Sequence, residues 1–183
     1  MITYYPMKYY EYYSRHVYYV VLAWKDIQDL LIEAGLINEA EFHKINQLII
    51  WHDNSKIEAD EFAAYAARFY PAGEENDEEG IERLFKQAWE AHKLKNPHHH
   101  QALKDYQGDD WKCYLVEMVC DWHAMGWEMG NTAYEYYEDN KASINLPSIY
   151  QEFLKLILAL IKERDKQAPQ ETLCKKLSRL VWS

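Results

Sequence analysis

The sequence predicts an all-α protein that folds as one compact helical bundle. Apolar residues recur at intervals of three and four along almost the whole chain, which is the spacing of a buried helix face. Six glycines and five prolines among 183 residues are too few for a β architecture rich in turns. A chain of this length suits one domain, expected over residues 1–183 with a core at about 8–140 and a C-terminal helix at about 147–168 plus a tail.

Four helices are expected in the first half of the chain. Gly35 is a suitable C-terminal cap for the first of them, and Asn38 is a suitable N-cap for the second. The acidic, turn-forming segment PAGEENDEEG is expected as a surface loop between the third and the fourth, and Asn96-Pro97 ends the fourth. These helices are expected at Met7–Ala34, from Asn38 into His52, at Glu58–Phe69, and over IERLFKQAWEAHKLK.

Three further helices are expected in the second half of the chain. The segment HHHQALKDYQG that precedes them is expected as a short helix or a loop. The first of the three starts near Asp109 or Asp110 and carries WKCYLVEMVCDWHAMGWEMG. TAYEYYEDN forms a short helix, and PSIYQEFLKLILALIKERDKQ forms a long amphipathic one. The sequence contains no internal repeat and no segment typical of a linker, which agrees with a single domain.

Charge and composition exclude several classes of partner. A formal net charge of −10 argues against extended nucleic-acid binding, because affinity for the phosphate backbone comes from clustered Lys and Arg. The chain has no apolar run of about eighteen residues, and the N-terminal MITYYPMKYYEYYSRH lacks the pattern of a secretion signal. Three cysteines without a CxxC pair fit reduced thiols. We therefore expect a cytoplasmic protein that does not contact a membrane, and whether it forms a homo-oligomer is left open.

The histidines and aspartates are the residues that point to chemistry. In WHDNSKIE, His52 and Asp53 stand side by side at the end of an apolar helical segment, where packing requires neither. Imidazole and carboxylate together suit iron, manganese, cobalt or zinc. A lone histidine is more often packed or exposed than a ligand, and the HHH run equally fits a solvated loop. The combination favours metal binding, and the candidate ligands are His16, His52, Asp53, His92, His98, His99 and Asp121.

The candidate ligands resemble those of the HD-domain metal-dependent phosphohydrolase superfamily, in which a lone His, a His-Asp pair and a later Asp stand on separate helices. Here these are His16, His52-Asp53 and Asp121, and His92 and His98-His99 are similar to the extra ligands of binuclear members. HDNSK is similar to the His-Asp-x-x-Lys stretch of the HD-GYP branch, but the GYP element is absent, so cyclic-dinucleotide specificity does not transfer. HDNSK, AWEAHKLKNPHHH and EMVCDWHAMG also resemble a small bacterial and phage family of HD-like proteins. The resemblance covers about residues 14–140.

This resemblance implies an HD-domain-like bundle that holds two divalent metal ions, with magnesium as a further candidate. Asp53 would bridge the two ions. His16, His52 and Asp121 would bind the first ion, and His92 with His98, His99 or both would bind the second. Two such ions can bind a phosphate between them and activate water, so that no side-chain nucleophile is required.

Two further residues are expected to act beside the ions. Lys56 would neutralise charge on the phosphoryl oxygens, and a solvated lysine at a helix start is the plain alternative. Glu117 lies one turn before Asp121 on the same helix face. It would hold a ligand histidine or act on the water. An ion pair between Glu117 and an Arg or Lys in the core is the equally suitable alternative.

Three histidines are left out of the expected site. His43 lies about two and a half turns before His52, so it is expected on the opposite face, as a structural or exposed residue. His123 is two residues after Asp121 and points away from it by the same geometry, so it is expected behind the ligands or exposed. His100 is the third of a run in which two suffice.

The expected function is hydrolysis of a phosphomonoester or phosphodiester on a nucleotide or another small phosphorylated metabolite. A mixed-valent diiron oxygenase of the HD-like type is an alternative, because that branch uses a similar set of four histidines and two aspartates. A non-catalytic binding or regulatory protein, in which metal only braces the helices, is another. Oxygenase chemistry needs iron and oxygen, whereas phosphoester hydrolysis tolerates several divalent ions. Metal identity therefore separates the first two.

Overall fold

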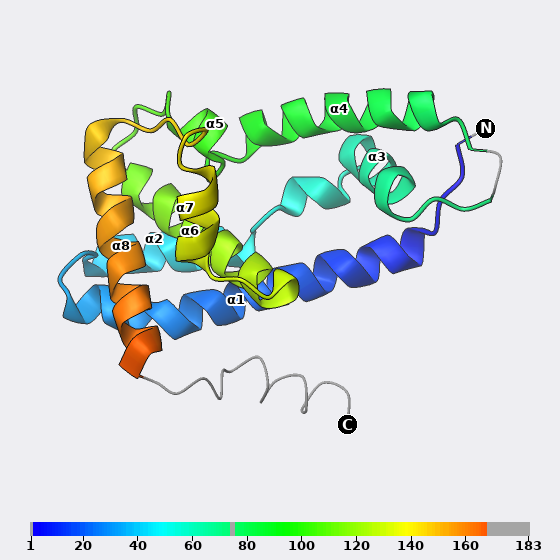
Figure 1. Cartoon of the computed structure of the whole chain (residues 1–183). Coiled ribbons are helices and arrows are strands. Elements are labelled where there is room, and N and C mark those ends of the chain that lie inside the picture. Colours follow the sequence, from blue (N-terminus) through cyan, green and yellow to red (C-terminus); the bar gives the residue numbers. More distant parts are fainter. Residues whose placement is uncertain (1, 74–75, 168–183) are drawn as a thin grey trace.

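A computed structural model describes residues 2–73 and 76–167 of the chain (Figure 1). Over these residues the secondary structure is helical, apart from one isolated β-bridge between Tyr4 and Pro71. The elements are α1 (Pro6–Glu33), α2 (Glu39–Ile50), the 3₁₀ helix η1 (Asn54–Ile57), α3 (Ala59–Phe69), α4 (Glu78–Lys95), α5 (His100–Leu103), α6 (Trp111–Met129), α7 (Ala133–Asn140) and α8 (Ser148–Gln167). The prediction of an all-α, single compact bundle is confirmed.

Local sequence explains several of the helix ends. α1 begins at Pro6, where the missing N–H costs no intrahelical hydrogen bond, and it is followed by Gly35 at φ 65°. The Asn38 side chain accepts a hydrogen bond from the Glu41 N–H, and the Glu41 carboxylate accepts one from the Asn38 N–H. At α4, the Asp77 side chain caps the helix, which therefore begins inside the segment predicted as a loop.

One predicted helix end is wrong, and the difference matters for the site. The second helix was expected to run into His52, but α2 ends at Ile50 and the chain leaves the helix at Trp51. Asp53 has φ 54° and ψ 22°, a left-handed conformation that cannot continue a right-handed helix. The chain therefore turns at His52 and Asp53 before η1 begins.

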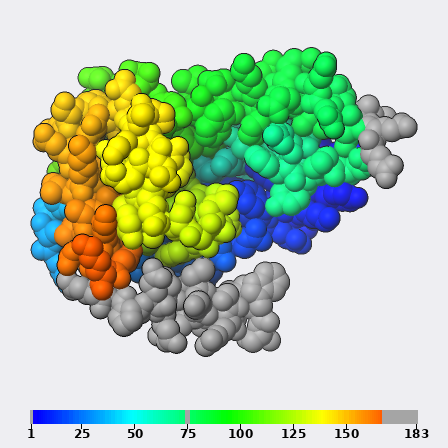
Figure 2. Space-filling model, viewed as in Figure 1, coloured from blue at the N-terminus to red at the C-terminus, as the bar shows by residue number. Residues whose placement is uncertain are grey.

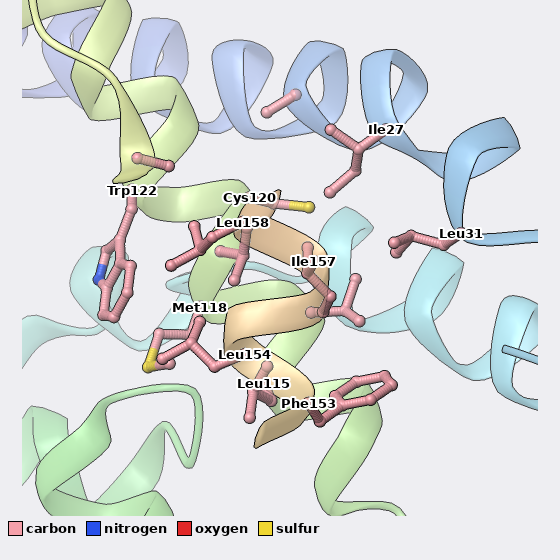
Figure 3. Close-up of a cluster of buried hydrophobic side chains, with 14 of the residues drawn as sticks. Ile27, Leu31, Leu115, Met118, Cys120, Trp122, Phe153, Leu154, Ile157 and Leu158 are labelled. Carbon is pink, nitrogen blue, oxygen red and sulfur yellow. The ribbon is translucent and has the colours of Figure 1, made fainter. Parts of the chain in front are cut away.

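Within the described residues there are two hydrophobic cores, and the larger forms where α6 packs across α1 and α2 and against α7 and α8. Helix α6 is buried over most of its circumference, which explains its nearly continuous apolar sequence. Figure 3 shows the side chains that converge here, among them Ile27 and Leu31 of α1, Leu115 and Met118 of α6, and Leu154 and Ile157 of α8.

A smaller aromatic core lies between α1, α3 and α4, with Tyr9, Ala64 and Tyr65 among its buried residues. Helix α1 runs along both cores, with α6 to α8 over one part of it and α3 and α4 over the other (Figure 1). His16 stands on α1 between Tyr9 in the smaller core and Val20 in the larger one. The candidate ligands thus come together where the two cores meet.

Two expectations from composition concern membrane-spanning helices and the cysteine thiols. None of the helices in the described part of the chain is long and apolar enough to span a bilayer. Cys113 and Cys120 are buried free thiols in the larger core, as small apolar side chains would be. Cys174 and the C-terminal tail lie outside the described residues.

Candidate metal centre

The turn after α2 carries both His52 and Asp53 into the interior. Trp51, the residue before them, is two-thirds exposed, whereas His52 and Asp53 are fully buried. Asp53 is the one residue other than glycine with positive φ in the described ranges. Such a conformation costs energy and persists where the surrounding structure holds it, which is common at functional sites. The backbone strain thus coincides with the central residue of the predicted metal site.

The structure brings all seven candidate ligands into one buried cluster. They come from α1, from the turn between α2 and η1, from the end of α4 and the segment after it, and from α6. Among these seven, two groups have ligand atoms that lie within 4.8 Å of one another: His16, His52 and Asp121 in one, and Asp53, His92, His98 and His99 in the other. A third group of the same kind joins His52 and His98 to Glu117. The first two groups correspond to the division that the family resemblance implies. Their roles as ligands stay a prediction.

Asp53 belongs to the second group and also faces the first group, with a different oxygen toward each. Its Oδ1 lies 3.1 Å from Nε2 of His92 and 3.4 Å from Nε2 of His98. Its Oδ2 lies 3.6 Å from Nε2 of His52 and 3.8 Å from Nε2 of His16. A carboxylate oriented in this way can serve one metal ion with each oxygen, as a bridging ligand does.

The buried ligand atoms lack partners within the described part of the protein. Nε2 of His52, His92, His98 and His99, together with Oδ1 of Asp53, is buried without a hydrogen bond. The contacts of Nε2 of His92 and His98 with Oδ1 of Asp53 are therefore not hydrogen bonds. Leaving one such polar group unpaired in the interior costs about 1–3 kcal/mol. A bound cation would satisfy these imidazoles and this carboxylate together, so the donor set fits a metal ion.

Glu117 on α6 lies behind two of the imidazoles, one from each group. Its Oε1 accepts a hydrogen bond from Nδ1 of His52 at 3.0 Å and lies 3.4 Å from Nδ1 of His98. A proton held on Nδ1 leaves the lone pair of Nε2 free to bind a metal. This geometry favours one of the roles expected for Glu117, in which its carboxylate orients the candidate ligand histidines.

Glu61 on α3 has the same relation to His92, and the sequence analysis missed it. This carboxylate is fully buried; Oε2 accepts hydrogen bonds from Nδ1 of His92 at 2.9 Å and from the Ser55 hydroxyl at 3.0 Å. Lys95 Nζ lies 3.3 Å from Oε1. Glu61 shares a helix face with the core residues Ala64 and Tyr65, and this helical phase is the one sequence feature that points to its burial.

Lys56 lies in the cluster rather than in solvent. Its Nζ is 2.5 Å from Oδ2 of Asp53, and its side chain is 16% exposed. Burial would lower the pKa of Lys56, but the carboxylates of Asp53 and Asp121 raise it above its ordinary value. Burial likewise would raise the pKa of Asp53, yet Lys56 and then His52 hold it well below its usual range. The pair is therefore an ammonium against a carboxylate.

His98 and His99 differ in their electrostatic surroundings although both lie in one group. Burial would lower the pKa of His98, but Glu117 and Asp53 raise it to about 9. Burial, and then the neighbouring His98, lower the pKa of His99 to about 2. His99 is thus neutral, which is the form that binds a metal. Because both rings reach the group, the choice between them stays open.

The three histidines that were not predicted as ligands lie outside the cluster of candidate ligands. His43 is exposed on α2, with a side-chain exposure of 69%, and His100 is half-buried at the start of α5. His123 was expected behind the ligands or exposed; it is buried, and it contacts Asp26. Its Nε2 lies 2.9 Å from Oδ2 of Asp26, which also contacts Arg164. His123 thus belongs to a separate ion cluster that joins α6, α1 and α8.

Comparison with known proteins gives a family and no activity. A sequence model described as a family of unknown function (DUF5662) matches residues 6–168. The match extends from the start of α1 into the residue after α8, so it includes every candidate ligand together with Lys56, Glu61 and Glu117. None of the curated proteins and none of the solved structures matches the chain.

Proposed function

We propose that this chain, which belongs to the family of unknown function DUF5662, is a metal-dependent phosphohydrolase with a binuclear centre. The observation that carries the proposal is the position of Asp53, whose two oxygens face two separate groups of buried ligands. A carboxylate that serves one ion with each oxygen would hold two ions close together, and two-metal hydrolysis uses such a pair of ions. The resemblance of the ligand order to the HD-domain superfamily supports the same chemistry.

Two divalent ions of iron, manganese, cobalt, zinc or magnesium would supply Lewis-acid activation of water and charge stabilisation on the phosphoryl group. The residues of the chain that would hold them are the two groups described above. Asp53 fixes the spacing of the groups by contacting both. Glu117 and Glu61 fix the orientation of His52 and His92, because each accepts the Nδ1 proton and leaves Nε2 directed at Asp53.

Lys56 supplies the positive charge that phosphoryl transfer requires beside the ions. As hydrolysis proceeds, negative charge gathers on the phosphoryl oxygens, and a fixed ammonium in a buried site stabilises it strongly. The raised pKa of Lys56 keeps this group charged at neutral pH. A compact ammonium also fits a crowded site in which Asp53 and Asp121 are both near.

Burial of the ligands supports a small substrate. Three site residues are only partly buried: His99, and Asp121 and Lys56, whose side chains are 17% and 16% exposed. In the space-filling view, part of the segment η1 to α3 is visible in a recess between α4 and α7 (Figure 2). A terminal phosphoryl group on a nucleotide or small metabolite would reach such a site more easily than the backbone of a long polymer.

The ligand set also supports a second candidate, a mixed-valent diiron oxygenase. That chemistry needs four histidines and two aspartates, which His16, His52, His92, one of His98 and His99, Asp53 and Asp121 would supply. The position of Lys56 favours hydrolysis, but an oxygenase would use the same lysine to hold an anionic substrate. Metal identity and oxygen dependence separate the two candidates.

The test is an activity panel run on protein purified without a histidine tag. Elemental analysis gives the bound metal, and phosphate release is then measured anaerobically on nucleotides, other phosphomonoesters and phosphodiesters. We expect release from at least one substrate, abolished by chelation and restored by a divalent ion. Strict dependence on iron and oxygen without phosphate release would favour the oxygenase. Bound metal with neither activity would favour a metal that braces the helices.

A further inference from the structure

Tyr65 has a buried hydroxyl that no other group in the described residues satisfies. Within those residues, most of the buried side-chain atoms without a hydrogen bond belong to the candidate ligands, and the others are Oε1 of Glu61 and the Tyr65 hydroxyl. The Glu61 oxygen has Lys95 Nζ at 3.3 Å as a charge partner. Tyr65 is thus the member of this set that is neither a candidate ligand nor part of an ion pair.

The Tyr65 ring packs against the metal centre from α3. Lys56 Nζ lies 5.4 Å from the centre of the ring, and the His92 ring meets it edge to face at 5.9 Å. Tyr65 is 4% exposed in the small aromatic core, where Tyr9 stacks on it at 6.2 Å. A tyrosine hydroxyl is protonated at neutral pH and can donate a hydrogen bond.

The donor has no acceptor in the centre itself. Oδ1 of Asp53 is also without a hydrogen bond, so the Tyr65 hydroxyl does not use that oxygen. Buried hydroxyls are nearly always paired with protein, water or ligand. A ligand oxygen placed beside Lys56 would be near the Tyr65 ring as well, because the ammonium lies over that ring.

We infer that the Tyr65 hydroxyl donates a hydrogen bond to an oxygen of the phosphoryl group, on the side where Lys56 neutralises its charge. This inference rests on the proposed function, because it assigns the ligand as a phosphoryl group. Tyr65 then contributes a neutral, fixed donor, and Lys56 contributes charge. Together they would distinguish a tetrahedral phosphoryl group from a planar carboxylate, which offers fewer oxygens to the same donors.

The test compares Tyr65→Phe with Tyr9→Phe, a matched control. Tyr9 is equally buried in the same aromatic core, but its hydroxyl donates to the Lys56 backbone carbonyl at 3.4 Å. Binding of inorganic phosphate to the metal-loaded proteins is measured by titration calorimetry. We expect Tyr65→Phe to keep its metal and to bind phosphate about tenfold more weakly, the loss of one hydrogen bond to a charged group. Tyr9→Phe should bind within about twofold of the wild type.

A second measurement separates a ligand role from a structural one. Tyr65→Phe in the metal-free state should melt at the wild-type temperature or above it, because the substitution removes a hydroxyl that has no partner there. A lower melting temperature together with lost metal would assign a structural role and overturn the inference. Unchanged phosphate affinity would also overturn it and leave the proposed function intact. If metal-loaded wild type binds no phosphate, the proposed function and this inference fail together.

Discussion

Lys56 Nζ lies 2.5 Å from Oδ2 of Asp53, the oxygen that faces His16 and His52. The ammonium is therefore placed beside the carboxylate that would join the two ligand groups. A lysine in this position can stabilise charge on a substrate held between those groups without binding a metal itself. The contact links the residue that organises the ligands to the residue that would act on the phosphoryl group.

Lys56→Ala is expected to keep its metal content and lose activity. Removing one preorganised donor from a reacting oxygen lowers the rate by about 10²-fold or more, equivalent to roughly 2.7 kcal/mol of transition-state stabilisation. Lys56→Arg should recover little, since a planar guanidinium does not replace a compact ammonium at a fixed point. Anaerobic phosphate release and elemental analysis of the same samples measure both quantities. Loss of metal in Lys56→Ala would instead make Lys56 a structural partner of Asp53.

Asp53→Ala is expected to lose metal and thermal stability together. Asp53 contacts both ligand groups, so its removal takes one oxygen from each. A ligand present at a hundred times its Kd contributes about 2.7 kcal/mol to stability. For a chain of this size, that loss lowers the Tm by about 5–10 °C. Full metal content and an unchanged melting curve in Asp53→Ala would place the metal elsewhere.

Helical phase predicts which histidines matter for metal content. His16→Ala, His52→Ala and His92→Ala should each lose metal in part, because each removes an Nε2 atom that faces Asp53. His43→Ala should change neither metal nor stability, since its side chain is mostly exposed. His123→Ala should keep the metal but lower the Tm, because Asp26 loses a buried partner. A crystal structure with metal on His43 or His123 would contradict the assignment.

Glu61→Gln is expected to weaken metal binding without touching a ligand atom. The amide oxygen accepts the Nδ1 proton of His92 less strongly, and substitutions of this kind cost about 10–100-fold in metal affinity. Glu58→Gln is the matched control, because Glu58 contacts the same Lys95 but its side chain is 53% exposed. Competition against a chelator of known affinity measures the difference. Equal metal affinities of the two variants would limit Glu61 to packing.

The sequence predicted the helices of this fold and the residues that meet at its centre. The spacing of apolar residues at three and four positions predicted α1, α6 and α8, because each of these helices buries at least one face in a core. Asn38 and Gly35 marked ends of helices through capping chemistry that is local to the chain. The ligand order along the chain identified seven residues that the fold brings together.

What the sequence did not predict depends on contacts between distant segments. The end of α2 at Ile50 follows from the left-handed Asp53, a conformation that the neighbouring residues do not require. Glu61 was missed because a carboxylate in the first turn of a helix is ordinarily exposed, and its burial depends on His92 thirty-one residues later. Tyr65 gave no signal either, because its unpaired hydroxyl is visible only in the folded core.

In the proposed mechanism, Asp53 joins two metal-binding groups into one hydrolytic centre. The most direct test is anaerobic phosphate release from the best substrate, measured while metal-free protein is titrated with the metal found in the native sample. We expect phosphate release to rise until about two equivalents of metal are bound in the wild type, and to stay absent throughout the titration of Asp53→Ala. Release that is independent of metal, or that persists in Asp53→Ala, would contradict it.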